Sequence, residues 1–324
     1  MEIEAFLARH GFGDATQIPM AGDASSRRYV RLKTGKNSAI LMIDPADDTN
    51  RFDAMSRHLI NIGLSAPKTL AHAPGLMVLE DFGDAQFASL IAHSPDAELD
   101  LYAAAIDVLT HIEATQPPSG LDKVTPDTLA EMIEPAFTHY APLFGSKPNG
   151  EDITNCLRDL LTSNIPDSNV LVLRDFHAEN LIWLPERDGV KRVGLLDYQD
   201  ALIGPPIYDL VSLLQDARRD VSPACHDAAL RKYLDSTGKA ETETVNAFHV
   251  LGLQRNLRIL GIFARLAADS GKPSYLNLIP RVWSHIQIGL NAPVASTLKP
   301  LVNRALPKPT RDRIDRARQQ CQTP

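Results

Sequence analysis

The sequence is poor in cysteine and in aromatic side chains. Its 324 residues include only 3 cysteines, and phenylalanine, tryptophan and tyrosine together make up 6% of the chain. The cysteines stand far apart, without a CxxC pair or a cluster with histidine. This spacing argues against a disulfide framework and against a structural zinc site, and it favours a reducing compartment.

An excess of positive charge and long apolar runs are also missing. The formal net charge is −7, whereas a protein that binds nucleic-acid backbone or an anionic membrane needs a basic face. No apolar run approaches the ~20 residues of a membrane span. The first residues, MEIEAFLARHGFGD, lack the basic start and apolar core of a signal peptide. We therefore expect a cytoplasmic protein without nucleic-acid or membrane partners, and the sequence leaves its oligomeric state open.

The first part of the chain alternates turn residues with β-prone runs. Residues 3–11 predict a short helix, TGKN predicts a tight hairpin turn, and AILMI predicts a buried central strand. Apolar residues at helical spacing follow in RFDAMSRHLINIG, and LMVLE predicts another strand. These patterns together indicate a small antiparallel sheet with one helix inserted.

Helical patterns dominate from about residue 84 onward. Residues 99–115, 128–144 and 151–164 each predict a helix, and most of the chain beyond residue 209 is helical again. The sequence therefore predicts an α+β fold, with a β-rich part followed by a larger, mostly helical part.

One strand-rich island within the helical part holds three polar residues in apolar surroundings. In LRDFHAENLIWLPERDGVKRVGLLDYQD these are Asp175, Asn180 and Asp197, and a β-hairpin is predicted between the last two. The hairpin brings Asn180 and Asp197 to the same end, and Asp175 lies in the loop that leads in. An amide oxygen and a carboxylate suit Mg²⁺, and a second carboxylate can accept a proton from a hydroxyl.

These motifs resemble a known family of kinases. LRDFHAEN, followed by LLDYQDA and IYDL, is similar to the HxDxxxxN loop and the second motif of aminoglycoside phosphotransferases and their kinase-like relatives. GDASSRRYVRL, LMVLEDFGD and the long helical segment after residue 252 resemble the bacterial branch that phosphorylates N-acetylmuramate and N-acetylglucosamine on the anomeric hydroxyl, in cell-wall sugar recycling.

The resemblance implies a bilobal protein-kinase-like fold. Residues 1–82 would form a nucleotide-binding lobe on a small antiparallel sheet, and residues 83–324 a helical lobe with the catalytic loop and the acceptor site. It implies ATP and Mg²⁺ as cofactors and a small molecule, an amino sugar, as the acceptor. The activity would be that of an ATP-dependent phosphotransferase with an alcohol group as acceptor.

Residue roles follow from the same resemblance. Asp175 corresponds to the catalytic base, and Asn180 and Asp197 to the Mg²⁺ ligands. Support of the loop or of the acceptor is expected from Arg174, His177, Asp200 and Asp209, of which Asp209 would fix the loop through backbone contacts. Nucleotide contacts are expected from Gly22, Ser25, Ser26, Arg28, Glu80 and Phe82, although GDASS is not a Walker loop.

Two features of the wider kinase pattern are absent. Leu173 stands where the catalytic loop usually opens with histidine, and no lysine lies near Met42, where a strand lysine usually grips the phosphates. The glutamate that pairs with that lysine is also absent from the next helix, and the joint loss avoids an unpaired buried charge. Candidates to replace the lysine are Arg27, Arg28 and Lys33.

Other functions stay open at this point. An aminoglycoside antibiotic phosphotransferase has the same motifs, choline or homoserine kinases are further relatives, and the missing lysine favours a nucleotide-binding pseudokinase. A protein kinase fits less well, because His177 stands where such enzymes usually place a lysine. Arg255 and Arg258 could contact the acceptor or belong to a packed helix.

Overall fold

The computed structural model describes residues 2–20 and 27–322 of the chain. Contacts divide it into two units, which we call the sheet unit (Met1–His111 with Ala178–Asp200) and the helical unit (Ile112–His177 with Ala201–Pro324). The chain thus passes from one unit to the other between His177 and Ala178. The division after residue 82 was expected between functional lobes, and it stays a prediction.

Five antiparallel strands form the sheet of the sheet unit. Their order is β1 (Thr16–Pro19), β2 (Arg28–Thr34), β3 (Asn37–Ile43), β5 (Leu76–Glu80) and β4 (Thr69–Ala73). The strand β3 is central and its Leu41 and Met42 are fully buried, as AILMI predicted. Thr34 pairs with Asn37 across the predicted hairpin turn, where Gly35 supplies a positive φ of 60°.

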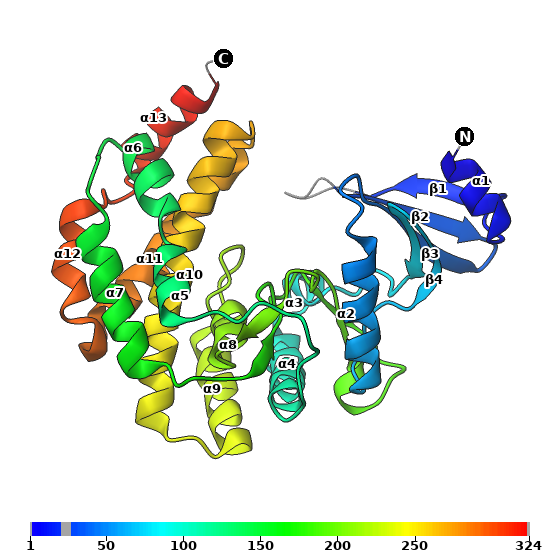
Figure 1. Cartoon of the computed structure of the whole chain (residues 1–324), viewed down its shortest axis with the longest axis horizontal. Coiled ribbons are helices and arrows are strands. Elements are labelled where there is room, and N and C mark those ends of the chain that lie inside the picture. Colours follow the sequence, from blue (N-terminus) through cyan, green and yellow to red (C-terminus); the bar gives the residue numbers. More distant parts are fainter. Residues whose placement is uncertain (1, 21–26, 323–324) are drawn as a thin grey trace. The chain divides into compact units, whose positions relative to one another are not determined.

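The two faces of this sheet differ. On one face lies α1 (Glu2–Arg9) (Figure 1). Its Phe6 and Leu7 pack with Leu32 and Leu41 in a hydrophobic core. Because successive side chains of a strand point to opposite faces, Tyr29 and its neighbours at two-residue spacing lie on the other face. The sheet therefore offers one face that α1 does not cover.

The rest of the sheet unit consists of helices and a short hairpin. The helices are α2 (Thr49–Asn61), α3 (Phe87–His93) and α4 (Glu98–Glu113), and 3-10 turns cover Pro95–Ala97 and Gly189–Arg192. The hairpin strands are β7 (Leu181–Trp183) and β8 (Val193–Leu195), paired antiparallel. The predicted hairpin is confirmed.

The helical unit is built around its longest helix, α10 (Glu241–Asp269), against which α7, α8 and α11 pack (Figure 1). Its other elements are α5 (Pro126–Glu131), the π-helical turn η2 (Ala136–Tyr140), α6 (Ala141–Leu143), α7 (Glu151–Asn164), β6 (Val170–Val172), β9 (Leu202–Gly204), α8 (Ile207–Leu214), α9 (Pro223–Thr237), η4 (Pro273–Asn277), α11 (Ile279–Asn291), η5 (Pro293–Ala295), α12 (Leu298–Ala305) and α13 (Arg311–Gln322). The small strands β6 and β9 pair antiparallel.

One predicted helix is broken in the structure. The pattern over residues 128–144 predicts a continuous helix, but α5 ends at Glu131 and the chain resumes at η2 after Pro135. Proline has no backbone N–H to continue a helix. At this break α10 comes so close that a Cβ on Gly261 would lie 2.1 Å from the carbonyl carbon of Pro135.

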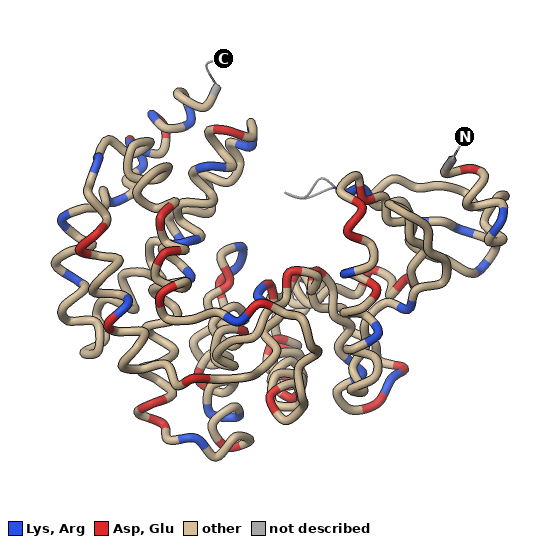
Figure 2. Tube along the Cα trace, viewed as in Figure 1, with Lys and Arg blue, Asp and Glu red and all other residues tan. Residues whose placement is uncertain are grey.

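Charged residues of both signs are interspersed along the trace of both units, and acidic residues gather where β3 leads into α2 (Figure 2). Within residues 2–20 and 27–322, none of the helices is long and apolar enough to cross a membrane.

Candidate active site

The hairpin of the sheet unit brings Asn180 and Asp197 together, although they are seventeen positions apart. Leu181 pairs with Leu195, and the backbone N–H of Leu196 donates to the carbonyl of Asn180 over 3.0 Å. The side-chain amide of Asn180 lies 3.4 Å from Oδ2 of Asp197. An amide and a carboxylate thus meet at one end of the hairpin, and these are groups that suit a hard divalent cation.

The segment around Asp197 is held in a fixed shape. Asp197 has a φ of 56°, a left-handed conformation that aspartate tolerates better than most residues. The buried side chain of Gln199 donates to its Oδ1 over 2.7 Å. Between them, Tyr198 is fully buried, with its hydroxyl 2.6 Å from the hydroxyl of Ser56 on α2. These contacts fix the direction of the Asp197 carboxylate.

Gln199 and Tyr198 were not among the residues that sequence reasoning selected. Their signal was weak, because one polar and one aromatic residue beside an aspartate that is expected to bind metal fit a turn as well as a buried support. Asp200, the next residue, is exposed and lies in the sheet unit.

In the helical unit, Asp209 at the start of α8 accepts two backbone hydrogen bonds from the predicted catalytic loop. The N–H groups of Leu173 and Arg174 donate to its two carboxylate oxygens over 2.6 and 2.8 Å. The carboxyl group is fully buried, and this burial raises its pKa to about 7, although the two backbone donors act in the opposite direction. The structure thus brings Asp209 to the backbone that precedes Asp175.

The loop itself is strained at Arg174. This residue has a φ of 72°, and the N–H of Asp175 donates to the carbonyl of Leu173 over 2.9 Å. Such a three-residue turn with a positive φ at its centre is rare and strained. Its persistence indicates that the surrounding contacts determine the position of Asp175.

Two further residues of the helical unit supply such contacts. The hydroxyl of Ser212 on α8 donates to the carbonyl of Arg174 over 2.9 Å, and Arg255 on α10 donates to the same hydroxyl over 2.7 Å. Arg255 is buried, whereas Arg258 is half-buried. Of the two roles left open for Arg255, the structure shows a packed residue that supports the loop.

His177 is a buried residue of the same loop. Its Nε2 lies 3.1 Å from the guanidinium of Arg218. Burial lowers the pKa of His177 well below its ordinary value, and the charges of Arg218 and Arg255 lower it further. Since arginine only donates hydrogen bonds, Nε2 accepts and the neutral ring has its proton on Nδ1. This environment suits a supporting residue of the loop.

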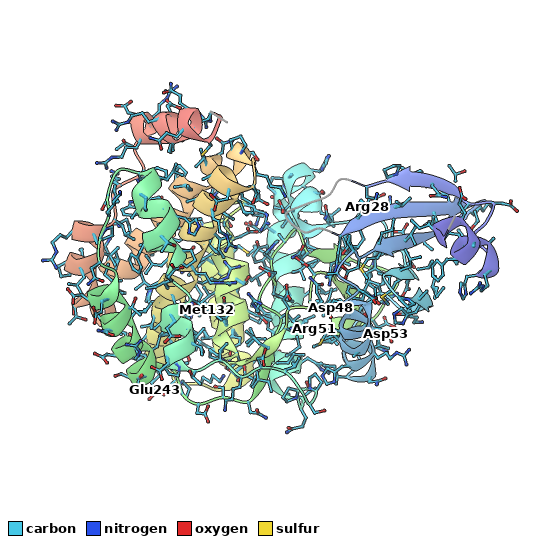
Figure 3. All side chains as sticks on the ribbon, turned by 45° about the horizontal axis from the view of Figure 1, so that its top comes forward. Arg28, Asp48, Arg51, Asp53, Met132 and Glu243 are labelled. Atoms are coloured by element: carbon cyan, nitrogen blue, oxygen red, sulfur yellow. The ribbon has the colours of Figure 1, made fainter. Side chains whose placement is uncertain are left out.

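Six residues were expected at the nucleotide. Gly22, Ser25 and Ser26 lie outside the residues that the structure describes, whereas Arg28, Glu80 and Phe82 belong to the sheet unit. Arg28 is exposed at the start of β2 (Figure 3). The Glu80 carboxylate pairs with Arg187 over 2.6 Å.

Phe82 lies under the same arginine, whose guanidinium carbon is 4.9 Å from the ring centre. The hairpin turn that carries Arg187 therefore contacts the segment where the adenine was expected. The roles of Glu80 and Phe82 toward a nucleotide remain predictions.

The positions where a lysine and its partner glutamate were missed hold side chains without an unpaired buried charge. Met42 is fully buried in β3. The following helix α2 does carry a buried carboxylate, Asp53, which accepts from the hydroxyl of Thr69 over 2.6 Å and pairs with Arg57 over 2.7 Å. The carboxylate of α2 thus has partners other than a strand cation.

Comparison with known proteins identifies the family. The model of the phosphotransferase enzyme family matches residues 16–245. The chain belongs to this family. It is 38% identical to the N-acetylmuramate/N-acetylglucosamine kinase of Caulobacter vibrioides, covering 95% of this chain and 96% of the relative. It is 31% identical to the kinase of the same name from Pseudomonas aeruginosa, covering 88% and 87%.

Solved structures show the fold of this phosphotransferase. A choline/ethanolamine kinase family protein from Mesorhizobium loti has a TM-score of 0.65 at 15% identity, covering 98% of each chain. A thermostable mutant of an aminoglycoside phosphotransferase, in ternary complex with ADP and hygromycin B, has a TM-score of 0.62 at 15% identity, covering 90% of this chain and all of that one (100%). The predicted kinase-like α+β fold is confirmed, and so is the prediction of a phosphotransferase that acts on a hydroxyl group.

Proposed function

We propose that this phosphotransferase uses Mg-ATP to phosphorylate the anomeric hydroxyl of N-acetylmuramate and N-acetylglucosamine, in the recycling of cell-wall sugars. The observation that carries the proposal is the 38% identity to a kinase of that name over 95% of this chain and 96% of the relative. Such coverage includes the helical unit, where acceptor contacts are expected. Similarity to antibiotic kinases stands at 15% identity and supports the fold alone. The use of ATP favours a cytoplasmic location.

Asn180 and Asp197 would hold the Mg²⁺ ion. The adjacency of their side chains fits this role, because Mg²⁺ takes few protein oxygens and shares the rest of its coordination with phosphates and water. Across the described part of the chain no group of three or more His, Cys, Asp or Glu side chains could hold a metal ion. When bound, the ion would neutralise charge on the phosphates of the nucleotide.

Asp175 would act as the base. The anomeric oxygen forms a bond to the γ-phosphorus as the bond from that phosphorus to the bridging oxygen of ADP breaks, and the proton of the hydroxyl passes to the Asp175 carboxylate. The turn at Arg174, tied to Asp209 and Ser212, supports this role because it restrains the backbone of Asp175.

Phosphorus NMR tests the proposal directly. The protein is incubated with Mg-ATP and, in separate samples, N-acetylglucosamine, N-acetylmuramate, their methyl glycosides and kanamycin. We expect a sugar-phosphate signal from the two free sugars and none from the glycosides, whose anomeric oxygen is blocked. Phosphorylated kanamycin without sugar phosphate would contradict the proposal and favour an antibiotic kinase.

The Asp175→Ala variant tests the pseudokinase alternative in the same assay. We expect the sugar-phosphate signal to disappear while ADP still binds. Equal phosphate signals from wild type and variant would favour a binding module without turnover.

A further inference from the structure

The sheet unit places a cation close to the position of the missing lysine. Tyr29 of β2 pairs with Met42 of β3, and Arg28 with Ile43 at the end of the ladder. By the two-residue alternation of strands, Arg27 and Asp44 extend the face that bears Tyr29 and Met42, which is the face that α1 does not cover. They therefore lie about 7 Å along the strands from the lysine position, within the reach of an arginine side chain.

Arg27 and Asp44 form a buried ion pair. The Nε of Arg27 donates to Oδ2 of Asp44 over 2.9 Å, and the two side chains are 9% and 1% exposed. The other carboxylate oxygen accepts from the backbone N–H of Ala46 over 3.0 Å. Asp44, directly after β3, thus anchors the guanidinium of Arg27.

The surroundings of Arg27 keep its side chain charged. Its Nη2 lies 4.0 Å from the carboxylate of Asp48, at the start of α2 (Figure 3). Burial alone would lower the pKa of Arg27, but the contact with Asp44 and the charges around it raise that pKa, so the side chain stays charged. Burial raises the pKa of the neighbouring Tyr29 phenol to about 12, and the charge of Arg27 acts in the opposite direction.

The other cations near this face are placed less favourably. Arg28 is exposed and points, by alternation, to the opposite face. Lys33 pairs in register with Ser38 near the far end of β2. Arg31 is on the same face as Arg27, but it pairs in register with Ile40, on the side of Tyr29 away from Asp44, and it forms ion pairs there with Asp81 and Asp84 over 2.7 Å each. The geometry therefore favours Arg27 over the alternatives.

We propose that Arg27, anchored by Asp44, binds the nucleotide phosphates in place of the strand lysine. A guanidinium presents N–H donors at Nε and at both Nη atoms, and Nε makes the bond to Asp44. The fork of an arginine suits two-pronged contact with phosphate oxygens. The inference rests on the proposed use of a nucleotide but does not depend on the sugar acceptor.

The test measures nucleotide binding by isothermal titration calorimetry, with ADP and adenosine as probes in the presence of Mg²⁺. Arg27→Met should weaken ADP binding about tenfold or more, since hydrogen bonds to charged groups are the stronger kind. Adenosine, which has no phosphates, should bind within about twofold of wild type, and Arg27→Lys should recover part of the ADP affinity.

Arg57→Met is the matched control. Arg57 also pairs through Nε with a buried aspartate of the sheet unit, Asp53, over 2.7 Å, but its side chain is 72% exposed. The ADP affinity of this variant should stay at the wild-type value. If Arg27→Met leaves Asp44 unpaired and fails to fold, the double variant with Asp44→Asn removes both charges and should show the same selective loss of ADP affinity.

Unchanged ADP affinity in Arg27→Met, an equal loss of ADP and adenosine, or a loss in Arg28→Met instead would each overturn the inference. None of these outcomes bears on the acceptor, because no sugar is present. The NMR experiment with wild-type protein decides the proposed function separately.

Discussion

At the residue scale, hydrogen bonds from a few side chains hold the backbone of the loop that carries Asp175. Asp209 accepts from two backbone N–H groups, and Ser212, which itself accepts from Arg255, donates to the carbonyl of Arg174. The turn with positive φ at Arg174 would relax without such contacts. The chemistry proposed for Asp175 therefore depends on residues that do not touch substrate.

His177 gives a prediction about pH. The unfolded chain binds a proton at this histidine near its ordinary pKa of about 6.5, whereas burial keeps the folded protein from doing so at that pH. Unfolding thus takes up a proton below about pH 6.5. For this group, the free energy of unfolding therefore falls by about 1.4 kcal/mol for each unit by which the pH is lowered. Replacing His177 with glutamine, which can accept from Arg218 without titrating, should reduce this loss.

The measurement compares melting temperatures at pH 7.5 and pH 5.5. We expect the wild type to lose more than His177→Gln over this interval. The matched control is His93→Gln at the exposed end of α3, which should behave as wild type. Identical losses in all three proteins would contradict the assigned state of His177.

Residue positions were predictable where local sequence order dictates them. The hairpin between Asn180 and Asp197 follows from turn residues and β-prone runs, so their adjacency could be read from the chain. The pairing of Arg27 with Asp44 could not, because it depends on the register of β2 and β3 and on burial. The same holds for Arg187, which reaches Glu80 from a turn more than one hundred positions away.

At the element scale, periodic patterns identified most helices and strands but missed the break at Pro135. Apolar spacing over residues 128–144 continues through the proline, and only the loss of its N–H reveals the interruption. The close approach of α10 at Gly261 is a property of packing between distant elements. The apolar spacing of α10 and of residues 128–144 therefore does not predict this contact.

Gly261 gives a prediction at this scale. A Cβ there would lie 2.1 Å from the carbonyl carbon of Pro135 and 2.3 Å from the backbone nitrogen of Ala136. Backbone cannot rotate away, so Gly261→Ala should force α10 and η2 apart. Overpacking of this kind costs about 1–3 kcal/mol or more, which exceeds the gain of about 1 kcal/mol in helix propensity.

Thermal unfolding checks this against Gly289→Ala in α11. The added Cβ of that variant would meet the side chain of Leu253, with Cγ at 2.8 Å, and a side chain can move aside. We expect a clearly lower melting temperature for Gly261→Ala than for Gly289→Ala. Equal values would show that η2 adapts to the larger residue.

At the scale of the whole molecule, the proposed reacting groups are divided between the two units. Asp175 belongs to the helical unit, whereas Asn180, Asp197 and Arg27 belong to the sheet unit. The chain passes between the units at Ala178, within the motif that joins the proposed base to the first proposed metal ligand. Binding of nucleotide and transfer of the phosphoryl group should therefore respond to different substitutions.

Two isosteric variants separate these functions. Asp197→Asn removes the charge of a proposed Mg²⁺ ligand, so ADP affinity should lose most of its dependence on Mg²⁺. Asp175→Asn removes the proposed base, so turnover should fall about 10²- to 10⁴-fold while ADP binds with Mg²⁺ as in wild type. Titration of ADP with and without EDTA, together with the NMR assay, measures both effects. Asp188→Asn, in the turn of the same hairpin, is the control for a lost carboxylate.

The opposite pattern would change the assignment. If Asp175→Asn abolished the Mg²⁺ dependence and Asp197→Asn kept it, the metal ligand would lie in the helical unit and the base in the sheet unit. Loss of both properties in both variants would instead mean that each carboxylate serves binding and transfer together. The expected pattern follows only if the sheet unit holds the metal and nucleotide and the helical unit provides the base.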